Sequence, residues 1–471
     1  MGLGLHGGGL ESARYLLHHG ASLTVTDLRD ERVLAPSIEQ LGPASSSVRY
    51  VLGRHEMDDF KNADMVIKNP GVPQSSPYLQ AARRIETDIS LFLAANPARL
   101  CAVTGSKGKS TVSRAIHWVL QKARGQENAY IGGNITVSPL TFLDDLKSTD
   151  DVVLELSSFQ LGDLAAGTTG GEGNTGGITP LLKPRVAVLT AIMSDHQDRY
   201  RDMDEYIADK RNIYRGQDGD DLTVASDDAW GMSFHAETRA RSLVYSNSPL
   251  GADVSGGWLT GPVAPGLACV RGKPLPGLAA DCVAELVPAR PLIPGIHQKQ
   301  NLLAAGLGLL GLGLEPETIR DGLASFGGVE HRLERFHEAG GLCFYNDSAA
   351  TIPEAAAACV EALCPQGPLI LVTGGTDKNL DFSPLVNVMG KAKKIILLAG
   401  SGSEKIASLL AETGIACSGP FDSLEKALLC ARESAASGDS VALSPGCASF
   451  GMFLNEFDRG RKWKAAVLEV F

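Results

Sequence analysis

The chain has 471 residues, which is too long for one hydrophobic core and predicts about two to four domains. Hydrophobic residues make up 44% of it and charged residues 21%, as in an ordinary soluble globular protein. The net charge of −11 excludes a nucleic-acid scaffold, because there is no basic excess to neutralise a phosphate backbone.

The nine cysteines are scattered and form no C-x-x-C pair. An odd cysteine count, without a secretory leader or a long apolar run, predicts a reduced, cytoplasmic protein with no membrane partner. Cys359 and Cys364 are the best candidate pair, but they lie in an alanine-rich stretch that is typical of a buried helix. We therefore expect no metal site there.

The chain opens with "GLGLHG" at residues 2–7, in the G-x-G-x-x-G spacing of a strand-to-helix turn that closes over a phosphate. Asp27 follows about twenty residues later at the end of the next apolar run, as in a dinucleotide fingerprint. Only Met1 precedes the loop, so we expect that Met1 is internal and that the natural chain begins upstream with a short apolar strand. Codons for a Val/Ile/Leu run before Met1 would support this expectation, whereas an in-frame stop would contradict it.

Short β-branched or aliphatic runs alternate with amphipathic stretches along most of the chain. We expect buried strands at 22–27, 64–71, 100–105, 151–156, 185–190, 368–375, 394–400 and 440–446. Strands that alternate with helices predict an α/β fold with parallel sheets, helices on both faces, and ligands at the carboxyl ends of the strands.

Two candidate domain boundaries lie at 94–100 and near 326–334. We expect three α/β domains, at about 1–93, 94–328 and 329–471. Within the middle one, the Gly/Thr-rich segment 167–180 predicts a flexible surface insertion. The stretch from about 250 to 290 is rich in Gly, Pro and Ala and predicts loose strands.

The strongest local signal is "CAVTGSKGKSTVSRAIHWVL" at 101–120, an apolar strand that runs through a glycine loop into a helix. The glycines let backbone N–H groups turn towards a phosphate, and the helix N-terminus favours an anion. Lys109 would reach the terminal phosphates and Ser110 would meet magnesium, so the pattern predicts an ATP site. The loop consists of Gly105, Ser106, Lys107, Gly108, Lys109, Ser110 and Thr111.

Two further strand ends carry candidate metal ligands. Glu155 ends a buried strand, where a carboxylate is costly unless it is paired or bound to a metal, and we favour a magnesium ligand. His196 follows the strand at 185–190, where a histidine serves for packing more often than as a ligand. From the residues alone, Lys210 is typical of a solvated helix lysine.

The last third of the chain offers polar side chains at similar places. Asp347 precedes a helix, so an N-cap role competes with ligand binding there. Arg332 lies in "EHRLE", which is either a charged hinge or part of a site. Lys378 and Ser449 follow two more apolar runs.

Taken together, these stretches resemble the Mur ligase family. The matching motifs occur in the family's order from Gly2 to Arg459 and are "GLGLHG", "TDLR", "NPGV", "TGSKGKST", "GGN", "ELSSFQL", "DHQDRY", "EHR", "NDSAAT", "GGTDKN" and "LSPGCASF". The resemblance implies an N-terminal Rossmann-like domain, here without its first strand, a central P-loop ATPase domain and a C-terminal Rossmann-like domain.

The resemblance also supplies roles for individual residues. It implies that the UDP-linked substrate is bound by Leu5, His6, Gly7, Asp27, Arg29, Asn69, Gly71, Gly133 and Asn134. It places the ATP adenine and ribose near Asn301, Arg332 and Asp347, and the incoming amino acid near Thr351, Lys378 and Ser449. Metal binding is assigned to Ser110, Glu155, His196 and Lys210, with Lys210 carbamylated.

The family's activity is an ATP-dependent carbon–nitrogen ligation in peptidoglycan precursor synthesis. For this chain the resemblance implies the joining of glutamate to UDP-N-acetylmuramoyl-L-alanine through an acyl phosphate, with ATP, two Mg²⁺ ions and a carbamylated lysine, in a cytoplasmic monomer. Lys109, His196, Lys210 and Lys378 would carry the chemistry. Cations are needed because an anionic carboxylate must approach an anionic phosphate.

Three departures lie near the acceptor amino acid. Ala349 stands where the family has a lysine, Ile352 where it has an asparagine, and Glu456, beside Phe457, where it has a phenylalanine. We favour D-glutamate as the acceptor, held mainly by Lys378, and L-glutamate is the alternative.

Other readings of the chain remain as alternatives. They are another Mur or folylpolyglutamate-type ligase, a nucleotide-gated binding protein with a degraded site, and an NAD-dependent oxidoreductase. A nucleotide-gated binding protein with a degraded site would have lost Lys109, Glu155, His196 or Lys210, and all four are present. An NAD-dependent oxidoreductase would leave the glycine loop at 105–111 unexplained.

Overall fold

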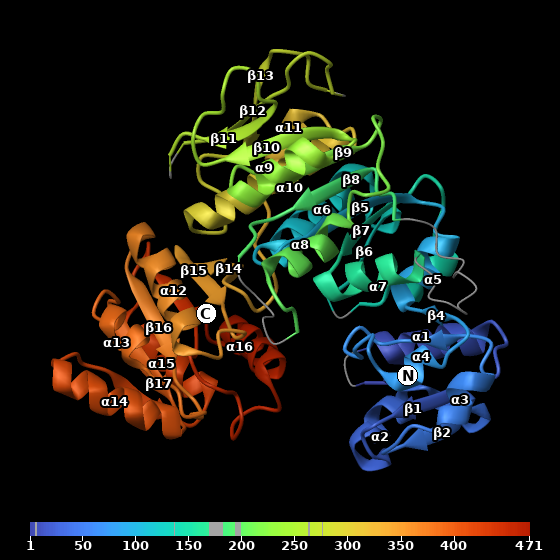
Figure 1. The fold of residues 1–471 in the computed structure, drawn as a ribbon. Helices are drawn as coiled ribbons and strands as arrows, with labels where there is room; N and C mark the ends of the chain where they lie inside the picture. The colour runs from blue at the N-terminus through green and yellow to red at the C-terminus, as the bar shows by residue number, and fades with distance from the viewer. Residues whose placement is uncertain (5–6, 136, 169–181, 194–198, 262–263, 276) are drawn as a thin grey trace. The chain divides into compact units, whose positions relative to one another are not determined.

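The computed structural model describes residues 1–4, 7–135, 137–168, 182–193, 199–261, 264–275 and 277–471. The chain forms two compact units, which are coloured along the sequence in Figure 1. The first unit consists of Met1–Arg290 with Gln300–Ala324, and the second of Pro291–Lys299 with Ser325–Phe471.

The first 95 residues of the first unit build two small parallel pairs of strands, β1 with β2 and β3 with β4. Met1 and Gly2 lie between them, because the Met1 nitrogen donates to the Ile67 carbonyl (2.8 Å) and the Gly2 N–H to the Thr26 carbonyl (2.8 Å). The elements are α1 (Gly8–His18), β1 (Thr24–Asp27), α2 (Glu31–Gln40), β2 (Arg49–Leu52), α3 (Met57–Asn62), β3 (Val66–Ile67), α4 (Pro77–Gln80), β4 (Ile85–Glu86) and α5 (Asp88–Ala95).

The rest of the first unit is built on a nine-stranded sheet in the order β13-β12-β11-β10-β9-β8-β5-β7-β6. Its strands from β6 to β11 are parallel, and β12 and β13 continue the sheet in antiparallel fashion. The strands are β5 (Arg99–Thr104), β6 (Ala129–Gly133), β7 (Asp151–Glu155), β8 (Val186–Leu189), β9 (Leu222–Ser226), β10 (Arg241–Ser246), β11 (Gly256–Leu259), β12 (Gly266–Cys269) and β13 (Val283–Val287).

Helices cover both faces of this sheet, as β-branched strands flanked by amphipathic helices require. One face packs on α7, α8 and α9 through an apolar core that includes Leu161, Ile207 and Phe234. On the other face α10 approaches closely, since a Cβ on Gly308 would lie 3.2 Å from the Val188 side chain. The helices are α6 (Lys109–Arg124), α7 (Ser158–Thr168), α8 (Met203–Arg211), α9 (Ala229–Glu237), α10 (Ile296–Gly311) and α11 (Pro316–Ala324).

The second unit is a six-stranded sheet in the order β14-β15-β19-β16-β17-β18, in which only β14 runs antiparallel to its neighbour. Helices α12, α13 and α14 share one apolar core, and α15 and α16 share the other. The elements are β14 (Glu334–Ala339), β15 (Leu342–Asn346), α12 (Pro353–Leu363), β16 (Leu369–Thr373), α13 (Ser383–Met389), β17 (Lys394–Leu398), α14 (Ser401–Thr413), β18 (Ser418–Phe421), α15 (Leu424–Ser434), β19 (Ser440–Leu443) and α16 (Glu456–Val470).

The predicted α/β class with mostly parallel sheets is confirmed, and each expected strand is present, often shorter than expected. The stretch from 250 to 290 contains β11, β12 and β13, and the Gly/Thr-rich segment lies almost wholly outside the described residues. The domain limits near 93 and 328 stay a prediction. Within the described parts of the chain, no helix has the length and apolar character needed to span a membrane.

Candidate active site

The glycine loop after β5 has a backbone that only glycine adopts easily. Gly105 and Gly108 have φ angles of 145° and 92°. A Cβ on Gly105 would lie 1.9 Å from the Thr190 Oγ1, and one on Gly108 would lie 2.3 Å from the Asn301 Oδ1. Helix α6 starts directly after Gly108, which has no side chain to cap the helix. The first N–H groups of α6 therefore remain available to an anion.

Two lysines meet at this loop. Lys109 Nζ donates to the carbonyl oxygens of Gly105 (3.0 Å) and Ser106 (3.1 Å), and Lys210 Nζ donates to the Gly105 carbonyl (2.9 Å). Lys210 is only 1% exposed, so it is not the solvated helix lysine that its sequence context indicates. Its Nζ lies 4.4 Å from the ring centre of Tyr206, whose hydroxyl bonds to the Ser106 hydroxyl (2.8 Å).

Glu155 ends β7 beside the loop, because β7 is the direct neighbour of β5. It is 1% exposed, and both described donors to its carboxylate are neutral: Ser113 Oγ (3.4 Å) and Asn134 Nδ2 (3.2 Å). A buried carboxylate with neutral donors favours a cation as its partner. Oxygen ligands of this kind suit Mg²⁺. The predicted substrate residues Gly133 and Asn134 thus lie against the predicted metal ligand, with Asn134 N–H donating to the Glu155 carbonyl (2.8 Å).

Three of the predicted site residues, Leu5, His6 and His196, lie outside the described residues. The strand end that leads towards His196 is described as far as 193, and Thr190 Oγ1 there is buried without a hydrogen-bond partner among the described residues. A polar atom in this position beside Gly105 is compatible with a bound polar ligand.

The N-terminal loops form a second group of predicted residues. The buried Asp27 carboxylate accepts hydrogen bonds from the Gly4 N–H (3.1 Å) and the Arg29 N–H (2.9 Å). Asn69 Nδ2 donates to the Gly2 carbonyl (3.4 Å), which ties the glycine loop to the "NPGV" turn. A cavity of about 590 Å³ lies beside these loops, lined in part by β1 and β3. The predicted residues described in this group are Gly7, Asp27, Arg29, Asn69 and Gly71.

In the second unit, Asp347 follows β15 and is buried. It accepts hydrogen bonds from Ser444 Oγ (2.7 Å) and from the Leu333 N–H (2.9 Å). Burial raises the pKa of Asp347 to about 7, although these hydrogen bonds and Arg332 act to lower it. Because Leu333 directly follows Arg332, the structure brings Arg332 and Asp347 to the same place. Asp347 is not an N-cap: α12 starts only at Pro353.

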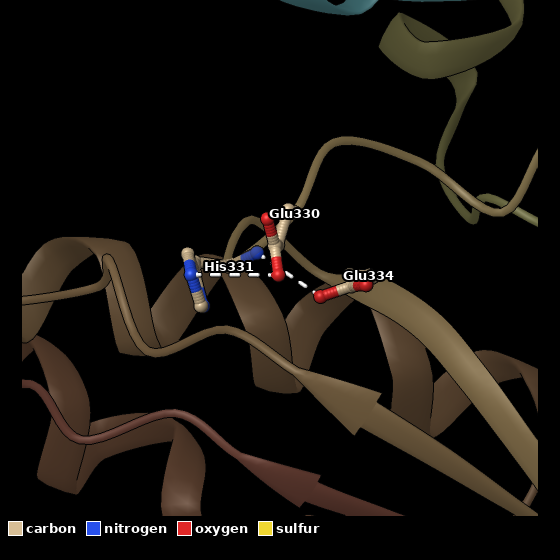
Figure 2. Close-up of side chains that lie close together, drawn as sticks. All are labelled: Glu330, His331 and Glu334. Atoms are coloured by element: carbon tan, nitrogen blue, oxygen red, sulfur yellow. Dashed lines mark hydrogen bonds and ion pairs between the residues drawn. The ribbon is translucent and has the colours of Figure 1, made fainter. Parts of the chain in front are cut away.

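The "EHRLE" turn next to it contains a cluster of one histidine and two glutamates (Figure 2). Ligand atoms of Glu330, His331 and Glu334 lie within 4.8 Å of one another. A cation is already present, since Lys464 Nζ lies 2.7 Å from Glu334 Oε1 and 3.4 Å from Glu330 Oε1. Asn346 Nδ2 donates to Glu334 Oε2 (2.9 Å). We therefore assign the cluster to holding the turn.

The predicted amino-acid residues come from neighbouring strand ends. Thr376 and Ala448 exchange two backbone hydrogen bonds (3.1 and 3.0 Å), which join the loops that carry Lys378 and Ser449. Lys378 is exposed and lies 5.4 Å from the ring centre of Phe450. Thr351 lies just before α12.

Sequence reasoning missed a buried arginine in this unit. Arg459 is 1% exposed and donates to Ser348 Oγ (3.0 Å), the Ser348 carbonyl (2.9 Å) and the Cys447 carbonyl (3.2 Å). Burial lowers its pKa to about 10. Arg459 thus joins the "NDSAAT" and "LSPGCASF" loops. Tyr206 was missed as well, although its position four residues before Lys210 on α8 places both on one helix face.

The raised pKa of Asp347 predicts a pH dependence of stability. The unfolded carboxyl ionises near its ordinary value of 3.8 and the folded one near 7, so the free energy of unfolding should fall as the pH rises from about 4 to about 7. Asp347→Asn should flatten this part of the profile, measured by thermal denaturation from pH 4 to 8. Asp381→Asn is the control, because hydrogen bonds from Ser383 lower the pKa of that exposed carboxyl. An unchanged slope in Asp347→Asn would contradict the assignment.

Three family profiles match the chain. They are the MurD-like N-terminal domain of Mur ligases at residues 1–90, the Mur ligase middle domain at 103–253, and the Mur ligase glutamate ligase domain at 331–447. Two solved structures share the fold, at 16–17% identity. One is a UDP-N-acetylmuramate-alanine ligase from Thermotoga maritima (TM-score 0.54, 98% of each chain), and the other a UDP-N-acetylmuramoyl-L-alanyl-D-glutamate–2,6-diaminopimelate ligase (TM-score 0.55, 95% of each chain).

Several relatives of closer sequence share the name UDP-N-acetylmuramoylalanine–D-glutamate ligase. The protein of that name from Treponema pallidum is 38% identical over 100% of this chain and 97% of its own length. The one from Roseiflexus sp. is 37% identical over 99% of this chain and 97% of its own length. With full-length relatives at this identity and profiles matched in all three parts, the chain belongs to the Mur ligase family.

Proposed function

We propose that the protein is an ATP-dependent ligase that joins D-glutamate to UDP-N-acetylmuramoyl-L-alanine in peptidoglycan precursor synthesis. The observation that carries this proposal is the convergence of Lys109 and Lys210 on the Gly105 carbonyl of the glycine loop. Full-length relatives with this activity in their name support the choice of substrates.

The reaction needs ATP because a carboxylate is a poor acceptor for an amine. Transfer of the γ-phosphoryl group to the alanyl carboxylate gives an acyl phosphate, and the attacking amine then expels phosphate through a tetrahedral intermediate. Approach of two anions must be assisted by cations, and water must be kept from the acyl phosphate.

The glycine loop would bind the ATP phosphates through its backbone N–H groups, with Lys109 at the terminal phosphates. Ser110, Glu155, His196 and carbamylated Lys210 would hold two Mg²⁺ ions. The neutral donors around the buried Glu155 carboxylate support this assignment. When bound, Mg²⁺ supplies positive charge that offsets the repulsion between substrate carboxylate and phosphate.

Carbamylation of Lys210 fits its surroundings. An unmodified lysine is costly to bury, and this one is almost fully enclosed beside the loop. The ammonium group first loses a proton, and the neutral amine then adds carbon dioxide and releases a second proton. The carbamate that remains is an anion, which suits a metal ligand. Asn301, Arg332 and Asp347 would contact the ATP adenine and ribose, and Thr351, Lys378 and Ser449 would bind D-glutamate.

The protein would act in the cytoplasm as a monomer. Nine free cysteines, five of them not fully buried, support a reducing compartment. The substrates are small molecules, and the net charge of −11 offers no support for a nucleic-acid partner.

Phosphate release measured with ATP, Mg²⁺ and UDP-N-acetylmuramoyl-L-alanine tests the activity. We expect release that depends on D-glutamate, with little or none for L-glutamate. Release with L-glutamate alone would reverse the acceptor assignment, and no release with any amino acid of a panel would contradict the ligase function.

Gly108→Ala should impair ATP binding, because its Cβ would displace Asn301 and its φ is left-handed. The matched control is Gly125→Ala at the other end of α6, where φ is 99°. Both should lower stability, by about 1–2 kcal/mol for the strained backbone, and only Gly108→Ala should weaken ATP binding by about tenfold or more in calorimetry. Equal ATP affinity of the two variants would contradict the role of the loop.

Lys210→Ala should lose most of the ligase activity and regain part of it when short carboxylates are added. The added carboxylate would occupy the place of the carbamate. The measurement is phosphate release with and without acetate or formate. Full activity without rescue would contradict the carbamate role.

A further inference from the structure

A buried ion pair links two parts of the first unit that are far apart in sequence. Lys68 directly follows β3, and Asp163 lies on α7. Their charged groups are in contact, and the side chains are only 2% and 3% exposed. Neither residue belongs to the predicted site, and the pair joins the UDP-substrate part of the chain to the ATP part.

Further contacts hold the same segment, residues 68–74, which we call the substrate loop. Gln74 Nε2 donates to the second carboxylate oxygen of Asp163 (3.0 Å). Arg199 Nη1 donates to the Pro70 carbonyl (3.3 Å), and its guanidinium lies 3.8 Å from the ring centre of Phe159 on α7. The loop is therefore held by both oxygens of one carboxylate and by a second cation.

Stability alone does not explain a pair in this position. Burial lowers the pKa of Lys68 and raises the pKa of Asp163, and in both cases the effect of burial is larger than the attraction between the two groups. A buried pair of this kind gains little over two apolar side chains of similar size. A charged pair adds conformational specificity, because the ammonium group must meet the carboxylate in one relative position.

The pair lies next to residues of both proposed sites, so this specificity affects how the two sites are spaced. Lys68 immediately precedes Asn69, whose side chain donates to the Gly2 carbonyl and accepts from the Gly71 N–H (3.1 Å). Asp163 is on the helix that starts just after Glu155. A fixed distance between the substrate loop and α7 is thus also a fixed distance between the proposed UDP site and the proposed metal ligand.

We propose that Lys68 and Asp163 are positioning residues that lock the substrate loop to α7 and so set the place of the UDP-linked substrate relative to the phosphate loop. This inference rests on the proposed function for the substrate it names. The pair itself touches no reacting atom and acts through Asn69 and Gly71.

The test compares Lys68→Met and Asp163→Asn with a matched control, Asp151→Asn. The Asp151 side chain is 2% exposed and pairs with Arg99 and Arg124, at the opposite end of β7 from Glu155. We expect KM for UDP-N-acetylmuramoyl-L-alanine to rise about tenfold in both pair variants, a coupling of about 1.4 kcal/mol. In the double variant, KM for UDP-N-acetylmuramoyl-L-alanine should also rise about tenfold, rather than by the product of the two single effects. KM for ATP should stay within about twofold in all three variants.

Asp151→Asn should lower the melting temperature as much as the pair variants while leaving KM for the UDP substrate within about twofold. An equal rise of this KM in Asp151→Asn, or no rise in either pair variant, would overturn the proposal. If one pair variant fails to fold, the other provides the same comparison.

Hydrogen exchange gives a readout that needs no activity. The N–H groups of Lys68, Asn69 and Val72 are bonded to Glu86, Met1 and Asn69 carbonyls. They should exchange faster in the pair variants than in Asp151→Asn, while α6 stays protected. Equal hydrogen exchange of the substrate loop in the pair variants and in Asp151→Asn would overturn the proposed lock, even if the ligase assay succeeds. If the protein shows no ligase activity but the loop exchanges faster in the pair variants, the lock is supported and the proposed function fails.

Discussion

The carbonyl oxygen of Gly105 accepts hydrogen bonds from two lysines, and the proposed reaction centre is arranged around it. One lysine comes from the helix that follows the loop, and the other from α8, about a hundred residues later. Two ammonium groups at one oxygen repel each other, so the arrangement favours anionic ligands. ATP phosphates and a carbamate on Lys210 would each relieve this repulsion.

Parallel pairing of β5, β7 and β8 puts three strand ends at one edge of the sheet. That edge brings together Gly105, Glu155 and Thr190, which no local pattern connects. The second unit has the same arrangement of parallel strand ends at one edge of the sheet. Asp347, Thr376 and Ser444 lie there, after β15, β16 and β19. The buried Arg459 joins two of these loops through carbonyl and hydroxyl oxygens, so it fixes backbone rather than neutralising a carboxylate.

Much of the fold and part of the site could be predicted before the structure. The strand at β5, the glycine loop and the start of α6 follow from local spacing, as does the carboxylate at the end of β7. The burial of Lys210 and the proximity of Arg332 to Asp347 could not be predicted from the residues alone. Helical spacing could have pointed to Tyr206 beside Lys210, but only the packing of α8 against the loop shows which face of the helix is buried.

The sequence by itself determined the order of the motifs, the alternation of strands and helices, and the glycine loop between β5 and α6, because each depends on residues that are close together along the chain. Only the tertiary structure decided which charges are buried and which partners they have. Lys68 meets Asp163 across 95 positions, and Lys210 meets Gly105 across 105. Desolvation acts on such groups through everything packed around them, so their pKa values and their roles follow from packing between distant segments.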